Sequence, residues 1–296
     1  MDVVCPSRIQ QSRAPAGQTE FATERPSDLV AVITSTSPWN PAVHVAATLA
    51  VRWQSLLTGC FLHESLRMLR GTESDSSVLE LLLDTPVRDF GQGHEFRSFA
   101  RLKGVPRASW VVARTGLARV LRELSAWHSL AVLERDVLNG AGLSEMLGEV
   151  LRTCRLPALI LPPGWNHDAR FSRVLVAWDG SAEATRAIHA ALPFLQGARR
   201  IVLLDGGRPH GPEDECYLPH FEPFVYMSRH GVEADPMCVD VAARTAGAAL
   251  LKKAEQVGAD LLVMGAYGHS PLRDRAIGGA TRHVLEHAQI PVFLQH

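Results

Sequence analysis

Glycines and one carboxylate gather at the ends of two apolar segments in the second half of the chain. An Asp-Gly-Ser stretch at 179–181 follows one segment, a Met-Gly-Ala-Tyr-Gly stretch at 264–268 closes the other, and two glycines at 278–279 precede a helical pattern. Glycine allows tight turns that bring backbone N–H groups close to a ligand, and a helix N-terminus attracts anions. A carboxylate such as Asp179 accepts hydrogen bonds from ribose hydroxyls or a base amino group. This combination predicts a nucleotide site.

Short apolar segments alternate with amphipathic helical patterns, and these elements must position the residues named above. Fully apolar strands separated by helices predict βαβ units, so we expect two tandem open parallel five-stranded sheets with flanking helices. Ligands of such sheets bind beyond the carboxyl ends of the strands, where the topology reverses. The expected strands are 29–33, 56–62, 110–113, 130–133, 158–161, 174–178, 201–204, 237–239, 261–264 and 292–294. The expected helices are 41–54, one or two within 64–107, 117–127, 143–153, one after Ser181, 221–230, 242–257 and 281–288.

A Pro-Pro-Gly stretch at 162–164 is the strongest linker signal in the chain, because proline restricts the backbone and glycine frees the next turn. We expect a flexible arm at 1–28, a first domain at 29–163 and a second domain at 164–296. The two domains repeat one order of elements, which indicates a single α/β unit used twice. We expect the copies to pack as an intramolecular pseudo-dimer that buries sheet edges. Whether two whole chains also form a homodimer stays open.

Three stretches of the second domain resemble the universal stress protein family. They are 173–181, 259–268, and Gly278 together with 290–292. The resemblance covers 172–296 well and 29–161 only through the order of elements, which implies a tandem member with a degenerate first domain. It also implies a cytoplasmic stress-response regulator that binds ATP or a related adenine nucleotide, with Mg²⁺, and acts on an unknown protein partner. The binding residues expected from this resemblance are Ala177, Trp178, Asp179, Met264, Gly265, Gly268, Gly278, Gly279 and Ala280.

The glycine loop departs from the family pattern at one position. Gly265, Gly268 and Gly278 fit the family's Gly-x2-Gly-x9-Gly-(Ser/Thr) spacing, whereas Gly279 stands where a Ser or Thr hydroxyl would contact phosphate. A backbone amide remains at that position. The first domain has no such loop, because its fourth expected strand runs into Glu-Arg-Asp at 134–136, and carboxylates repel a phosphate. We therefore expect one nucleotide site, in the second domain.

Composition argues against several other classes of protein. Lys plus Arg number 30 and Asp plus Glu number 31, and this net charge of −1 does not fit a surface that coats nucleic acid. No apolar run is long enough to span a membrane, and residues 1–28 lack the apolar core of a secretory signal. The five cysteines include no Cys-x-x-Cys pair, so we expect free thiols in a reducing cytoplasm rather than a disulfide scaffold or zinc site.

Three functions remain open on the sequence alone. We favour a nucleotide-binding regulator without catalytic residues, because no spacing singles out a nucleophile or general base. The alternatives are an interaction or scaffold protein of the same fold that binds no nucleotide, and a slow nucleotide hydrolase. His283 and His287, and the Cys, His and acidic residues at 210–220, have metal-ligand types, but no further ligand converges with either group and we expect no metal site. The arginines within 273–282 either pair with phosphate or face solvent.

Overall fold

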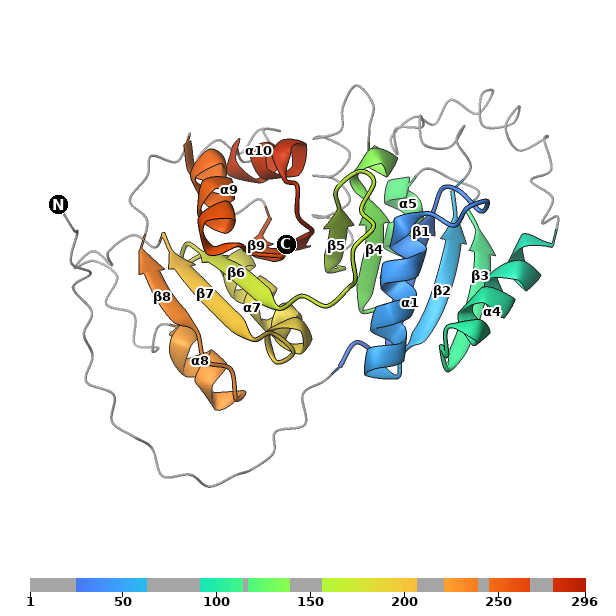
Figure 1. Cartoon of the computed structure of the whole chain (residues 1–296), viewed down its shortest axis with the longest axis horizontal. Coiled ribbons are helices and arrows are strands. Elements are labelled where there is room, and N and C mark those ends of the chain that lie inside the picture. Colours follow the sequence, from blue (N-terminus) through green and yellow to red (C-terminus); the bar gives the residue numbers. More distant parts are fainter. Residues whose placement is uncertain are drawn as a thin grey trace.

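One continuous sheet organises the part of the chain that the computed structural model describes, which is residues 25–62, 91–113, 117–138, 156–206, 221–238, 245–266 and 279–296. Its strand order is β3-β2-β1-β4-β5-β10-β9-β6-β7-β8 (Figure 1). The strands are β1 (Asp28–Ile33), β2 (Leu56–Phe61), β3 (Arg107–Val112), β4 (Leu130–Glu134), β5 (Ala158–Leu161), β6 (Arg173–Trp178), β7 (Arg200–Asp205), β8 (Asp235–Cys238), β9 (Leu261–Gly265) and β10 (Val292–Gln295). All ten expected strands are present, with ends shifted by at most three residues.

The two halves of this sheet share one topology. Each half orders its strands 3-2-1-4-5, and every pair within a half is parallel. The halves meet where β5 and β10 pair antiparallel, with Leu159 opposite Phe293. The predicted five-stranded parallel sheets are confirmed, and the structure adds that they join edge to edge. This junction gives hydrogen-bond partners to backbone groups that an open edge would leave unpaired.

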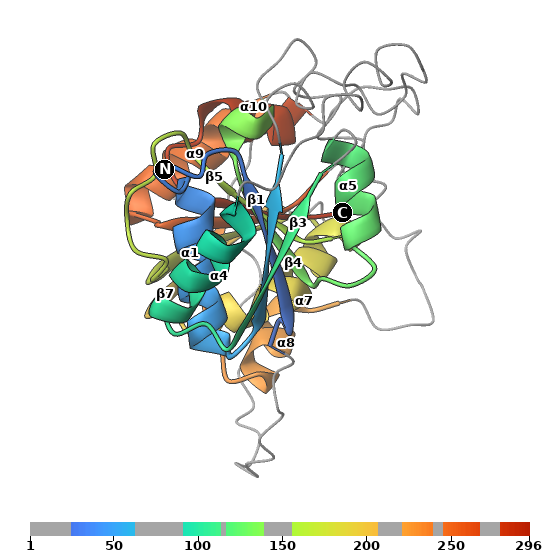
Figure 2. The same cartoon turned by 90° about the vertical axis from the view of Figure 1, so that its right-hand side faces the viewer.

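Helices cover both faces of the sheet. They are α1 (Pro41–Trp53), α4 (Gln92–Leu102), α5 (Leu117–Leu124), the short 3-10 helix η1 (Arg135–Leu138), α7 (Ala182–Leu195), α8 (Pro223–Arg229), α9 (Ala246–Val257) and α10 (Gly279–His287). Buried residues of α1, α4, α7 and α8 belong to one apolar cluster, and those of α5, α9 and α10 to another. Figure 2 shows α1 and α4 on one side of the sheet and α5 on the other. The layers are therefore helix, sheet, helix.

Local sequence signals explain where several helices begin and end. The Ser181 side chain accepts a hydrogen bond from the Ala184 N–H and so caps the first turn of α7. Gly258 ends α9 with φ +60°, a left-handed conformation that glycine adopts without strain. Helix α10 begins at Gly279, two residues before the expected start. The helix expected at 143–153 lies outside the described residues.

Aromatic side chains from both halves form a joint core at the centre of the molecule. The rings of Trp53 on α1 and Phe194 on α7 lie edge to face with centroids 4.9 Å apart. Phe194 also contacts Phe293 of β10, at 5.4 Å, and Phe171, at 5.7 Å. Trp53 is 7% exposed and the other three rings are at most 2% exposed. Burial of this aromatic area is a large apolar contribution to stability, and here both halves share it.

Two cysteines are described, and they differ in state. Cys60 is a free thiol whose burial raises its pKa to about 12. Cys238 is disulfide-bonded, and its partner lies outside the described residues. The expectation of free thiols throughout is therefore wrong for Cys238, because Cys-x-x-Cys spacing detects only cysteines that are close in sequence. Within the described ranges, no helix is long and apolar enough to cross a membrane.

Candidate functional site

The sheet reverses its topology between β6 and β9, which are neighbours in the second half. Strand β6 pairs with β9 on one side and with β7 on the other. The chain continues from β6 to β7 in one direction along the sheet and from β9 to β10 in the opposite direction. Ala177 and Met264 are opposite each other near the carboxyl ends of these two strands. Open α/β sheets bind ligands just beyond such a point. The structure thus brings together the two strand ends that the sequence selected.

Asp179 follows β6 and builds the turn into α7. Its Oδ1 atom accepts hydrogen bonds from the Ser181 N–H, at 3.0 Å, and from the Ser181 hydroxyl, at 2.5 Å. Gly180 between them has φ +79°, which favours glycine. Asp179 is exposed, and the second oxygen of its carboxylate, Oδ2, has no partner among the described residues. One oxygen of this carboxylate therefore shapes the turn, and the other is available to a ligand.

Gly265 ends β9 directly against the N-terminus of α7. A Cβ atom at this position would lie 2.5 Å from the Ala184 nitrogen and 2.7 Å from the Glu183 carbonyl carbon. Both neighbours are backbone atoms of a helix, so only glycine fits without moving the helix or the strand. From the sequence we expected this glycine to be needed for ligand binding, whereas the close packing of β9 against α7 already requires a residue without a side chain here. This packing also holds the end of β9 beside the turn that Asp179 builds.

Ala177 and Trp178 point to opposite faces of β6, as successive residues of a strand do. Ala177 packs against the apolar cluster of α9 and α10, and Trp178 against the cluster of α1 and α7. Both residues are half-buried. The Trp178 indole Nε1 atom is buried and has no hydrogen-bond partner in the described part of the chain. A buried N–H without a partner is unusual in proteins, and this one lies at the edge of the candidate site.

The start of α10 supplies the remaining described part of the expected site. Gly279 is exposed, and a Cβ atom built on it would have no neighbour within 4 Å among the described residues. Helix α10 rests on α9, since a Cβ atom at Gly247 would lie 2.9 Å from the Ala280 carbonyl oxygen and 2.7 Å from the His283 Cβ. Gly268 and Gly278 lie outside the described residues, so their roles stay predictions.

The equivalent position of the first half contains a buried carboxylate. Strands β1 and β4 are neighbours there as β6 and β9 are in the second half, and Glu134 ends β4 as Gly265 ends β9. The Glu134 Oε2 atom accepts a 2.6 Å hydrogen bond from Nδ2 of Asn40, the residue that precedes α1. Glu134 is 8% exposed and Asn40 is 5% exposed. This position is therefore already occupied by a buried carboxyl group beside a helix N-terminus, where the second half has a glycine.

Arg135 follows Glu134 and links the two halves. Its guanidinium donates to the carbonyl oxygens of Leu285, at 3.1 Å, and Ala288, at 2.9 Å. These carbonyls lie at the end of α10, where a cation is favourable. Burial lowers the pKa of Arg135. The sequence showed the charges at 134–136 but not the residues that they contact. The partner of Glu134 is 94 positions away in sequence, and those of Arg135 are 150 and 153 positions away.

Titratable groups elsewhere do not form a metal centre in the described parts of the chain. No three His, Cys, Asp or Glu side chains there lie close enough to hold an ion. His283 and His287 lie on one face of α10, and their rings stack with centroids 4.3 Å apart. The histidine pair that the sequence considered is thus a local stacking contact. The acidic and Cys-containing stretch at 210–220 lies outside the described residues.

These features define an α/β protein with a candidate ligand site at a topological switch point, and part of the chain is similar to a known protein family. Residues 235–296 match the model of the Universal stress protein family. A universal stress protein of Synechocystis sp. is 28% identical over 157 residues, which are 51% of this chain and 50% of that protein. The chain thus spans about half the length of this curated relative. The last part of the chain is thus similar to the Universal stress protein family over residues 235–296.

Solved structures share this architecture over nearly the whole chain. A universal stress protein from Archaeoglobus fulgidus has a TM-score of 0.57 at 16% identity, covering 90% of this chain and 95% of that one. A candidate universal stress protein from Pseudomonas aeruginosa has a TM-score of 0.59 at 16% identity, covering 93% and 94%. At such low identity, these similarities establish the fold and leave the ligand to be tested.

Proposed function

We propose that the chain is a regulatory stress-response protein that binds ATP or a related adenine nucleotide in its second half. The site lies between the turn at Asp179 and the start of α10. The observation that carries this proposal is the asymmetry of the two switch points. The second half presents a glycine and a carboxylate oxygen that has no partner among the described residues, whereas the first half fills the equivalent position with Glu134. One nucleotide per chain is therefore expected.

Each described element has a separate part in binding. The Asp179 Oδ2 atom accepts hydrogen bonds from ribose hydroxyls or a base amino group. The free N–H groups of the first turn of α10 donate to phosphate oxygens, which the helix dipole also favours. The described residues provide no three-ligand metal site, so Mg²⁺ would arrive with the phosphates that ligate it. Bound nucleotide would cover the start of α10 and so change a surface that a partner protein contacts.

The proposed role is binding rather than turnover. Asp179 shares one oxygen with the turn and lies beside Ser181, which is 2% exposed and caps α7. A buried capping hydroxyl is a poor nucleophile, because its attack would uncap the helix. We therefore expect any hydrolysis of the bound nucleotide to be slow.

Equilibrium binding of labelled ATP tests this proposal, with Gly279→Glu as the decisive variant. The exposed position accommodates a side chain, and a carboxylate at a helix N-terminus favours the helix while repelling phosphate. We expect Gly279→Glu to lose ATP binding and keep its stability, and Gly279→Gln, of the same shape, to retain most binding. Asp179→Asn should weaken binding. Equal affinity of the Glu and Gln variants would exclude phosphate binding at the start of α10.

An interaction protein that binds no nucleotide is the second candidate, and one observation favours it. Strand–helix packing explains Gly265, and the turn into α7 explains Asp179, without any ligand. Absence of saturable binding at millimolar ATP, together with no excess 260 nm absorbance in freshly purified protein, would support this candidate. Repeated release of product well above a slow leak would instead support the hydrolase.

A further inference from the structure

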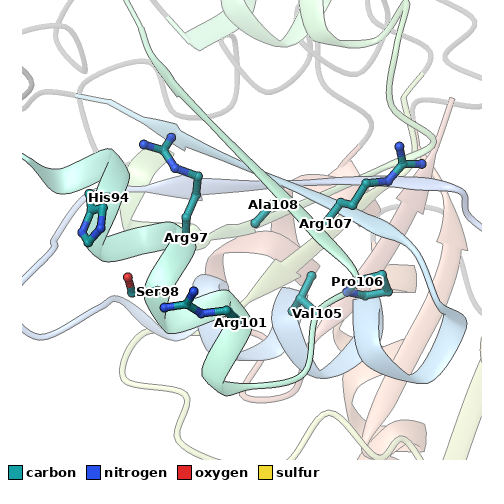
Figure 3. Close-up of a pocket in the computed structure, with 8 residues that line it drawn as sticks. All are labelled: His94, Arg97, Ser98, Arg101, Val105, Pro106, Arg107 and Ala108. Carbon is teal, nitrogen blue, oxygen red and sulfur yellow. The ribbon is translucent and has the colours of Figure 1, made fainter.

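A groove runs along the β3 edge of the sheet, far in sequence from the nucleotide site. It has a volume of about 380 Å³ and lies between α4 and β3 (Figure 3). The turn and strand contribute its apolar part, with Val105, Pro106 and Ala108. Its polar lining is His94, Arg97, Ser98, Arg101 and Arg107. Figure 3 shows His94, Arg97, Ser98 and Arg101 on α4, and Arg107 pointing away from that helix.

The charge of this groove is strongly positive and is not neutralised locally. Arg97, Arg101 and Arg107 are exposed, and none of them forms an ion pair with a described residue. Helix α4 has one acidic residue, Glu95, and it is not among the residues that line the groove. The whole chain has a net charge of −1, so a local excess of arginine is a feature of this edge. Grooves lined by charge of one sign attract ligands of the opposite sign.

Among the described residues, the outer side of the edge strand has backbone hydrogen-bonding groups without a strand partner. β3 pairs with β2 on one side, and no described strand lies on its other side. The Ala113 N–H donates to the Phe61 carbonyl of β2. Because successive residues of a strand point their N–H and C=O groups to opposite sides, those of Trp110 and Val112 point toward the open side. This edge is a template for an additional strand.

Apolar side chains are also exposed at this edge. Val111 of β3 is 38% exposed, and Leu102 at the end of α4 is 87% exposed. Trp110 faces α4, with its ring 5.3 Å from that of Phe96, so Val111 lies on the opposite face of the strand. The edge therefore carries Arg97 and Arg101 on the face that α4 covers, and Val111 together with Arg107 on the other face.

We propose that the β3 edge binds an extended acidic segment of a partner protein, which adds to the sheet as a further strand. Main-chain hydrogen bonds to β3 supply part of the affinity, as in other strand-addition complexes. Alternate carboxylates of the segment face Arg97 and Arg101, and the intervening apolar side chains cover Val111. A second copy of this chain does not fit, because pairing two β3 strands would bring like charges together.

Fluorescence anisotropy with a labelled peptide in which Val and Glu alternate tests this proposal. We expect saturable binding that weakens as salt rises, and no binding of the peptide with Lys in place of Glu. Arg97→Glu and Arg101→Glu should each weaken binding roughly tenfold, through a lost attraction and an added repulsion. Arg229→Glu is the matched control, because Arg229 is exposed on α8 near the other edge of the sheet. This variant should bind the peptide with the affinity of the unsubstituted protein.

A second probe separates strand pairing from charge attraction without altering the protein. The same peptide with alternate backbone nitrogens methylated keeps its charges and loses donors to β3. We expect it to bind roughly tenfold more weakly, in one of the two methylation registers. Equal binding of the methylated peptides, or equal competition by a single-stranded oligonucleotide of the same charge, would overturn the proposal. Failure of the unmodified peptide to bind at millimolar concentration would overturn it as well.

Discussion

Asp179 and Gly265 show how single residues serve both the fold and the candidate site. Asp179 uses Oδ1 to hold the turn into α7, and Gly265 lets β9 end against the first turn of that helix. Each residue therefore fixes the position of the other through the same helix terminus. The site is preorganised by contacts that exist whether or not a ligand is bound, which lowers the ordering cost of binding.

Gly265→Ala tests whether the contact between the end of β9 and the first turn of α7 excludes any side chain at position 265. The added methyl group would overlap the backbone of α7, and we expect a loss of about 1–3 kcal/mol in the free energy of unfolding. Chemical denaturation measures the change. Gly279→Ala is the control, since its Cβ would meet nothing within 4 Å, and it should be neutral or slightly stabilising. Equal midpoints for the two variants would contradict the packing argument.

At the scale of elements, the start of α1 depends on a contact between residues far apart in sequence. Asn40 donates from Nδ2 to the Glu134 carboxylate and also, at 3.2 Å, to the Val32 carbonyl. The contact ties α1 to β1 and β4 at once. A carboxylate near a helix N-terminus also complements the helix dipole. Glu134 thus stabilises the first half at the position where the second half has Gly265.

Glu134→Ala should lower the free energy of unfolding by about 1–3 kcal/mol, because the buried Asn40 amide loses a charged acceptor. Glu134→Gln, which keeps the shape and an acceptor oxygen, should cost less. A double-mutant cycle with Asn40→Ala measures the coupling by chemical denaturation. Strictly additive effects of the two single substitutions would show that the hydrogen bond contributes nothing to stability.

The strands were predictable because they are buried on both faces and therefore almost wholly apolar in sequence. The two edge strands were the least accurate, because both have exposed residues that interrupt the apolar pattern: β3 begins three residues and β8 two residues before the expected segment. α10 starts at a glycine, which has a low helix propensity, so its first turn was missed. The antiparallel β5–β10 pairing, the Glu134–Asn40 contact and the bonded state of Cys238 depend on residues distant in sequence, which no local pattern encodes. The candidate site was predictable as two strand ends, but the packing requirement on Gly265 was not.

At the scale of the whole molecule, the two halves share one core as well as one sheet. Trp53 of the first half packs on Phe194 of the second, and Phe194 packs on Phe293 of the strand that joins them. Loss of either half would expose the aromatic surface of the other. We therefore expect the two halves to unfold together in one cooperative transition.

Trp53→Ala tests this coupling. Truncation of this ring, which is 7% exposed, should cost about 3–5 kcal/mol and raise hydrogen exchange in β6 and β9 as well as in β1 and β4. Trp127→Ala is the control, because Trp127 is 79% exposed and should change stability by no more than about 0.5 kcal/mol. A change in exchange confined to the first half would show that the halves unfold independently.

The antiparallel junction between β5 and β10 also determines how the protein responds to dilution. Two separate five-stranded units that met at this edge would dissociate as their concentration fell. Here a short covalent connection between β5 and β6 keeps each unit at an effective concentration on the order of millimolar relative to the other. The junction should therefore persist at the lowest protein concentrations, and only unfolding or chain cleavage would separate the two units.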